Sequence, residues 1–261
     1  MNELTVNHRK QLATLSAGKG RKATGLFLVE GIRAVAEMNL AMPGAMREIV
    51  ATAAWWGEHP DFPVASGVDQ YVAKKADIDR ISTLSTPQPI IAAFAIPETP
   101  VPSVSELSSQ LTVALDSVQD PGNLGTIIRL CDWWGVRHLF CSTGTVDCYS
   151  PKVVQSSMGA LGRVAVHRVS LPELITELIG CDVPVCGTFM QGDDILHSPL
   201  PASGAMLVLG NEGNGISPEI ERLVSRRLTI PSFAPADHVE SLNVATACAV
   251  CLAMFRRNSS N

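Results

Sequence analysis

Residues Gln119 to Val136 read QDPGNLGTIIRLCDWWGV and follow the apolar run LTVALDSV of residues 111–118. The apolar run is typical of a buried strand, and Asp120-Pro121-Gly122 favours a turn before an apolar helix with Asn123 as its N-cap. Arg129 lies six residues further on, roughly 9 Å along the helix axis, so its guanidinium can lean back toward the helix start. Taken alone, the stretch is as well explained by a capped helix with a surface arginine.

Apolar strand-like runs alternate with helical stretches through the rest of the chain. Continuously apolar strands in alternation with helices predict an α/β domain with a parallel sheet covered on both faces. Ligands of such sheets bind at the carboxyl ends of the strands. The expected strands are residues 111–118, 138–143, 164–169, 183–189, 205–210 and 227–231, and the expected helices begin near Asn123, Pro151, Leu171, Ser217 and Ser241.

Residues 1–97 have a different character and predict a separate small α/β domain. We expect a helix near residues 5–16, a strand at 26–31, a helix at 32–40, and strands at 47–52 and 89–96. Residues 98–110 are rich in proline and serine, which favours an extended, solvated linker. The domains predicted are therefore 1–97, the linker 98–110, and 111–261.

A glycine-rich cluster, LVLGNEGNGIS, occupies residues 207–217. Its glycines permit backbone conformations and close ligand approach that side chains would block. Glu212 stands among them and would repel a pyrophosphate, so a neutral or cationic ligand fits better. Ser217-Pro218 is a typical helix start.

The stretch TIPSFAPADHVESLNVATACAV, residues 229–250, forms a third cluster. We expect Ser241 to be the N-cap of a long apolar helix. The loop before it carries Asp237, His238 and Glu240, to which we assign no role.

Composition excludes several classes of protein. The 261 residues are 46% apolar and 17% charged, as in a soluble globular protein, and no apolar run approaches the length of a membrane span. The start of the chain lacks an apolar signal core, and seven cysteines agree with a reducing compartment, so we expect a cytoplasmic protein. Cys248 and Cys251 fit a buried helix, and we expect no metal site.

The formal net charge of −5 argues against nonspecific coating of nucleic acid. A local basic patch is still possible near the start of the chain. It would be either a solvated helix face or an RNA contact, and its residues are Arg9, Lys10, Lys19, Arg21 and Lys22.

Together the three clusters resemble the motifs of the SpoU (TrmH-like) RNA ribose 2′-O-methyltransferases of the SPOUT superfamily. Their Asn-x-Gly-x-x-x-Arg motif matches Asn123, Gly125 and Arg129. Their Gly-x-Glu-Gly-x-Gly motif matches Gly210, Glu212, Gly213 and Gly215, and their third motif matches Ile230-Pro231 and Ser241-Leu242-Asn243-Val244. The resemblance covers residues 111–257, and residues 1–97 resemble the family's L30e-like substrate-binding domain.

The resemblance implies a deep trefoil knot in the C-terminal domain, S-adenosylmethionine as cofactor, an RNA substrate and a homodimer formed through that domain. It favours RNA contact for the basic patch, and rRNA of the 23S type over tRNA because of the extra N-terminal domain. It implies catalytic roles for Asn123, Arg129, Glu212, Ser241 and Asn243. The expected cofactor-binding residues are Thr188, Leu209, Gly210, Asn211, Gly215, Ile230, Pro231 and Leu242.

The loop Ser232–Glu240 departs from the family pattern. It is longer than the family's loop, which puts the shape of the cofactor pocket in question but not the class.

Three rival functions can be weighed against the sequence. A nucleotide-binding oxidoreductase would need the G-x-G-x-x-G fingerprint, which we do not find. A tRNA ribose methyltransferase would carry the same motifs and differ only in its RNA. A non-catalytic RNA-binding protein with a knotted cofactor site is disfavoured because all the motif residues are present.

Overall fold

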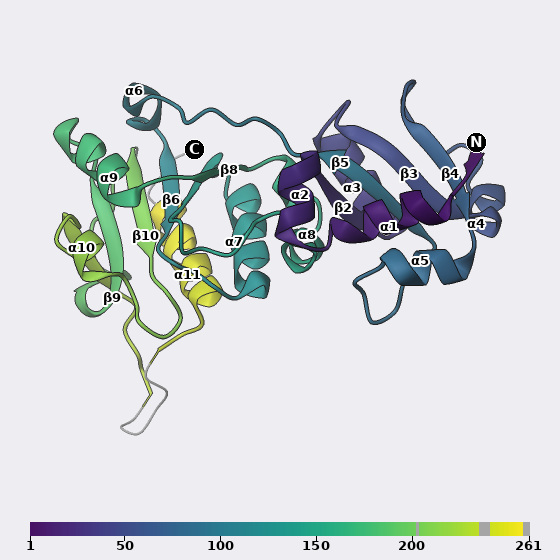
Figure 1. Cartoon of the computed structure of the whole chain (residues 1–261). Helices are drawn as coiled ribbons and strands as arrows, with labels where there is room; N and C mark the ends of the chain where they lie inside the picture. Colours follow the sequence, from purple (N-terminus) through teal and green to yellow (C-terminus); the bar gives the residue numbers. More distant parts are fainter. Residues whose placement is uncertain (202–203, 235–240, 258–261) are drawn as a thin grey trace. The chain divides into compact units, whose positions relative to one another are not determined.

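The structure is a computed structural model that describes residues 1–201, 204–234 and 241–257 (Figure 1). The chain divides into two compact units. The first unit is Met1–Glu98 together with Asp147–Arg163, and the second is Thr99–Val146 together with Val164–Asn261. Residues Asp147–Arg163, which the sequence analysis places in the C-terminal domain, thus pack with the N-terminal part of the chain.

The sheet of the first unit has the strand order β1-β4-β3-β5-β2. β1, β4 and β3 are parallel, whereas β5 runs antiparallel to both β3 and β2. The strands are β1 (Asn2–Glu3), β2 (Leu26–Glu30), β3 (Met46–Thr52), β4 (Asp69–Ala73) and β5 (Ile90–Ala95), and the helices are α1 (Val6–Thr14), α2 (Gly18–Thr24), α3 (Ile32–Ala41), α4 (Ala53–Glu58), α5 (Lys75–Ile81), α8 (Pro151–Ser157) and the 3-10 turn η1 (Ala160–Gly162).

The core of this unit follows from the alternation of side chains along its strands. Leu28, Val50 and Ile91 point to one face and pack with Leu12 of α1 and Ile78 of α5. On β2 the neighbouring Phe27 points to the opposite face, where its ring lies 4.9 Å from that of Tyr149. The expected helices and strands of residues 1–97 are confirmed, but β1, β4, α2, α4 and α5 were not predicted.

The second unit contains a six-stranded sheet with the order β11-β9-β10-β6-β7-β8. Every neighbouring pair in it is parallel, as the sequence predicts. The strands are β6 (Leu111–Leu115), β7 (His138–Cys141), β8 (Ala165–Arg168), β9 (Val185–Asp194), β10 (Ala205–Leu209) and β11 (Arg226–Thr229), and the helices are α6 (Val104–Leu107), α7 (Pro121–Trp133), α9 (Leu171–Gly180), α10 (Pro218–Glu221) and α11 (Val244–Arg257).

Helices cover both faces of this sheet (Figure 1). Ala114 and Phe140 point to the face on which Ile175 of α9 and Ile220 of α10 pack. The other face is closed by α7 and α11, whose buried residues include Cys131, Cys248 and Cys251. All seven cysteines are free thiols, and no group of metal ligands occurs in the described part of the chain.

Three local expectations need correction. The N-cap of α7 is Asp120, whose side chain accepts a hydrogen bond from the Asn123 N–H group, and Asn123 lies inside the helix. Asn243 rather than Ser241 caps α11, because its side-chain oxygen accepts from the Ala245 and Thr246 N–H groups. The predicted linker 98–110 contains α6, whose Leu107 is fully buried in the core of the second unit.

Among the described residues, none of the helices combines the length and apolar character needed to cross a bilayer.

Candidate active site

The candidate site lies at the carboxyl ends of neighbouring strands of the second unit. β6 leads into the turn before α7, and β10 leads into the glycine-rich loop Gly210–Ser217. Because β6 and β10 are adjacent and parallel, with Leu115 paired to Leu209, the two loops leave the sheet side by side. Two motifs that are far apart in the sequence therefore meet at one edge.

Glu212 joins these two loops. Its carboxylate accepts hydrogen bonds from the N–H groups of Gln119 and Asp120, at 3.3 and 3.2 Å, and from the Asn123 side-chain amide at 3.0 Å. Burial alone would raise the pKa of Glu212, but the hydrogen bonds from Asn123 and the backbone outweigh it, so this pKa lies below its usual range. The ionised carboxylate of Glu212 therefore stabilises the turn before α7.

Asn123 extends this connection to the third motif. Its side-chain oxygen accepts a hydrogen bond of 2.9 Å from the Asn243 amide nitrogen, while its own nitrogen donates to Glu212. Asn243 in turn caps α11 through its side-chain oxygen. The chain Asn243–Asn123–Glu212 thus links all three sequence motifs by direct contacts.

The backbone of the glycine-rich loop is tightly folded. Gly210 has no room for a side chain, because a Cβ atom there would lie 2.1 Å from the Gly215 carbonyl carbon. Asn211 and Gly215 exchange backbone hydrogen bonds, and the Asn211 side-chain oxygen accepts from the Gly213 and Asn214 N–H groups. Gly215 has φ of +68°, a left-handed conformation that favours glycine.

Asp116 and Ser117 were not singled out from the sequence, yet they brace the same loops. The buried carboxylate of Asp116 accepts from the Ser217 N–H group at 2.8 Å. Ser117 has φ of +60°, and its carbonyl oxygen accepts from the Asn211 amide at 2.7 Å. The sequence signal for them is weak: two polar residues directly follow an apolar strand, and a polar residue that becomes buried there needs hydrogen-bond partners.

The proposed cofactor residues are partly brought together. Thr188 lies at the irregularity where the pairing of β9 with β11 shifts register. Its hydroxyl group donates to the carbonyl oxygen of Val208 at 3.4 Å, and Val208 directly precedes Leu209 and Gly210 in the chain. Ile230 and Pro231 follow the end of β11, and Leu242 is half exposed just before α11. Residues 235–240 of the long loop, with Asp237, His238 and Glu240, lie outside the described residues.

Arg129 lies on the exposed face of α7, and within the described residues its guanidinium has no hydrogen-bond or ion-pair partner. Ser241 is exposed at the start of the described segment 241–257. Both side chains are thus accessible to a ligand and unpaired in the part of the chain that the structure describes, whereas the polar groups of Asn123 and Glu212 are hydrogen-bonded within the protein.

The basic residues of the first unit divide into two groups. Arg21 is buried, and its guanidinium contacts Asp147 at 2.6 Å and the carbonyl oxygens of Leu15 and Ser16. Arg9 pairs with Asp77 at 2.6 Å. The guanidinium groups of Arg9 and Arg21 thus stabilise the first unit through these contacts, whereas Lys10, Lys19 and Lys22 are exposed.

Comparison with known proteins gives two family matches. Residues 110–253 match the SpoU rRNA Methylase family, and residues 7–92 match the MRM3-like substrate binding domain. The chain is 31% identical over 250 residues to the 23S rRNA (guanosine(2553)-2′-O)-methyltransferase RlmP of Bacillus subtilis, covering 95% of both chains.

Solved structures agree with these matches. A protein from Porphyromonas gingivalis, assigned to the TrmH family of RNA methyltransferases, is 41% identical with a TM-score of 0.86, covering 98% of this chain and 99% of that one. An AdoMet-bound rRNA methyltransferase from Sinorhizobium meliloti is 27% identical with a TM-score of 0.84, covering 100% of this chain and 98% of that one. The chain therefore belongs to the SpoU rRNA methylase family.

Proposed function

We propose that this protein methylates the 2′-hydroxyl group of a ribose in large-subunit rRNA, with S-adenosylmethionine as the methyl donor. The observation that carries the proposal is the chain Asn243–Asn123–Glu212, which joins all three family motifs at one edge of the sheet, with Asn123 on the same helix as the exposed Arg129. The names of the B. subtilis and S. meliloti relatives support rRNA as the substrate. Both relatives match the chain over nearly its whole length, N-terminal domain included.

The glycine-rich loop fits the proposed cofactor. S-adenosylmethionine would supply an electrophilic methyl group on a positively charged sulfur. The residues that we assign to the cofactor carry backbone groups and neutral side chains around the strand ends, and they would bind the sulfonium without a carboxylate. They are Thr188, Leu209–Asn211, Gly215, Ile230, Pro231 and Leu242. The carboxylate of Glu212 is already hydrogen-bonded and serves to shape the loop.

Arg129 is the group that we assign to the ribose. A 2′-hydroxyl becomes nucleophilic as it loses its proton, and a fixed guanidinium stabilises the alkoxide that develops, or the phosphate beside it. Arginine stays protonated in proteins, so we do not assign it as the base. Ser241 is exposed and can contact the same ribose, whereas Asn123, Glu212 and Asn243 position the helix that carries Arg129.

We further propose that the second unit forms a homodimer through α7 and α11, and that its backbone forms the trefoil knot of the superfamily. Trp133, one helical turn beyond Arg129, is 82% exposed, and tryptophan is enriched at protein–protein interfaces. We place residues 1–97 in RNA binding and residues 111–261 in catalysis, joined by residues 98–110, whose helix α6 packs on the second unit, with the exposed Lys10, Lys19 and Lys22 as RNA contacts. The free cysteines favour the cytoplasm as the compartment.

The test is methyl transfer from labelled S-adenosylmethionine to RNA from a strain that lacks the gene, separated into rRNA and tRNA. We expect label in the 23S rRNA, recovered as a 2′-O-methyl nucleoside. Label in tRNA alone would refute rRNA as the substrate. Label recovered as a base-methylated nucleoside would refute the ribose as the acceptor.

A further inference from the structure

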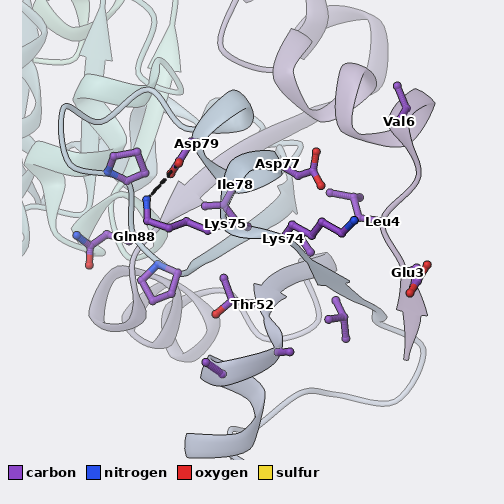
Figure 2. Close-up of a pocket in the computed structure, with 16 residues that line it drawn as sticks. Glu3, Leu4, Val6, Thr52, Lys74, Lys75, Asp77, Ile78, Asp79 and Gln88 are labelled. Carbon is purple, nitrogen blue, oxygen red and sulfur yellow. Dashed lines mark hydrogen bonds and ion pairs between the residues drawn. The ribbon is translucent and has the colours of Figure 1, made fainter.

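A cavity of about 820 Å³ opens in the first unit at the carboxyl ends of β3 and β4 (Figure 2). Its walls come from five short segments that the fold brings together. Their lining residues are Glu3, Leu4, Val6, Thr52–Ala54, Val72–Lys75, Asp77–Asp79 and Pro87–Pro89. Its volume lies in the range of about 300–1,000 Å³ that small-ligand pockets occupy.

The wall of the cavity is mostly apolar, and its polar groups are few. Leu4, Val72 and Ile78 contribute aliphatic side chains. The Thr52 hydroxyl oxygen accepts from the Trp55 N–H group and can still donate a hydrogen bond. The Gln88 amide nitrogen donates to the Thr86 carbonyl oxygen, which leaves its side-chain oxygen as an acceptor.

Most charged side chains on the lining of the cavity are paired with one another or with neighbouring residues, and Lys74 is the cation that can contact a ligand. Asp77 pairs with Arg9 at 2.6 Å and with Arg80 at 3.5 Å, and Asp79 pairs with Lys75 at 3.1 Å. Lys74 is exposed on the lining and forms no hydrogen bond or ion pair within the described residues, although its charge joins those of Arg9 and Arg80 in lowering the pKa of Asp77. Glu3 is the remaining carboxylate and belongs to β1 at the edge of the sheet.

We propose that this cavity binds one unstacked nucleotide of the RNA substrate, an inference that rests on the proposed function. The aliphatic wall would cover the face of the base, Thr52 and Gln88 would bind its edge, and Lys74 would contact its phosphate. Proteins that read single-stranded RNA splay out a base, cover its face and hydrogen-bond its edge; the cover is usually an aromatic ring, whereas here it would be aliphatic side chains. Arg9 and Arg21 are paired within the first unit, so we do not count their guanidinium groups among the RNA contacts.

Two variants separate this site from general charge attraction. Lys74→Ala removes the phosphate contact, and Ala54→Trp fills the cavity from an exposed position on its lining without changing charge. Arg33→Ala is the matched control, because Arg33 is an exposed cation of the same unit outside the cavity. Thermal unfolding checks that each variant is folded.

The probe is a short fluorescein-labelled single-stranded RNA of mixed sequence, titrated with the full-length protein at several KCl concentrations. We expect both cavity variants to weaken binding about tenfold, which lies at the lower end of the loss measured for one base stacked on an aromatic ring. The salt dependence of Lys74→Ala should fall by roughly 0.7 in slope, as for one lost phosphate contact on a single strand. Nucleoside monophosphates should compete with the probe, whereas ribose 5-phosphate should not.

Binding by Lys74→Ala and Ala54→Trp that stays close to wild type would overturn the cavity site, and so would an equal loss in Arg33→Ala. The same proteins are assayed for methyl transfer. A wild type that methylates rRNA while both cavity variants bind normally overturns the cavity site alone. A wild type that binds RNA through the cavity but transfers no methyl group to any RNA overturns the proposed function alone.

Discussion

At the scale of single residues, Asn123 shows how far a motif can be interpreted without a structure. The sequence indicates that Asn123 belongs to the site, and the structure places its amide between Glu212 and Asn243. The predicted capping role was wrong because Asp120, three residues earlier, satisfies the helix end instead. Such contacts could not be predicted, since the partners lie 89 and 120 positions away.

Arg129 gives a prediction about the chemical step. Arg129→Ala should lower kcat by about 100-fold or more, because the developing charge on the ribose oxygen loses its fixed partner. The affinity for S-adenosylmethionine should change little, since the exposed guanidinium contacts no described residue. Single-turnover methyl transfer and calorimetric titration of the cofactor measure the two effects separately.

Arg129→Lys distinguishes a forked contact from a point charge. A planar guanidinium can contact two oxygens at once, which an ammonium group cannot reproduce. We expect most of the rate to be lost in this variant as well. A rate near that of wild type would show that charge alone suffices.

At the scale of elements, Gly210 sets the shape of the loop after β10. Gly210→Ala places its methyl group against the backbone of Gly215 and Ile216, at 2.1 and 2.2 Å, so the loop must move. We expect the affinity for S-adenosylmethionine to fall about tenfold or more. Calorimetric titration of the variant with the cofactor measures this loss.

Gly213→Ala is the control from the same loop. An added Cβ there would meet its nearest neighbour, the Asn211 side-chain oxygen, at 3.6 Å, an ordinary contact. Its affinity should stay within about threefold of wild type, a difference of less than 1 kcal/mol. Equal losses in both alanine variants would show that flexibility rather than close approach matters in this loop.

The adjacent strands β7 and β8 give a prediction about pH. His138 Nδ1 and His167 Nε2 lie 3.1 Å apart, and burial, with the neighbouring His138, lowers the pKa of His167 to about 4. The unfolded chain binds this proton near pH 6.5, so stability is present above that pH and is lost as pH falls toward 4. The loss amounts to at most about 1.4 kcal/mol per pH unit.

His167→Phe should therefore flatten the dependence of stability on pH in this range. Phenylalanine keeps a ring beside Phe140, whose centroid lies 5.0 Å from that of His167, but does not titrate. Urea unfolding at about pH 7 and about pH 5 should show the smaller loss in the variant. Equal losses in the variant and in wild type would assign the pH dependence to other groups.

Elements with a continuous apolar pattern were predictable, and the others were not. The central strands β6, β7 and β10 are buried along almost their whole length, and this makes them visible in the sequence as continuous apolar runs. By contrast, α2 reads GKGRKAT and buries only the side chain of Arg21, so it lacks the apolar face by which a helix is recognised. β4 is mostly half-exposed, and its place between β1 and β3 is set by tertiary pairing.

At the scale of the whole molecule, the chain leaves the second unit at Asp147 and returns to it at Val164. The segment between is held on the first unit by the buried Arg21, by Phe27 against Tyr149, and by Gly159, where a Cβ would lie 2.7 Å from the Glu37 Cβ. No periodicity in the sequence indicates this exchange, because it depends on contacts between distant segments.

Arg21→Met should therefore loosen two distant segments at once. Removing the guanidinium takes the donor from one carboxylate oxygen of Asp147 and from two carbonyl oxygens, a loss of about 2 kcal/mol. Hydrogen exchange should accelerate in peptides from residues 15–30 and from 147–163, and stay unchanged in 111–140. Lys22→Met, at an exposed neighbouring position, serves as the control.

If exchange in residues 147–163 stayed at the wild-type rate, the segment would be held by its apolar contacts alone.

The central claim is that the site around Arg129 methylates a ribose of large-subunit rRNA. The most direct measurement is mass spectrometric mapping of 2′-O-methyl nucleosides in 23S rRNA from strains with and without the gene, complemented with wild type or with Arg129→Ala. We predict one 2′-O-methyl group that is absent without the gene, returns with wild type and does not return with the variant. A 23S rRNA with the same ribose methylation in every strain would contradict the account.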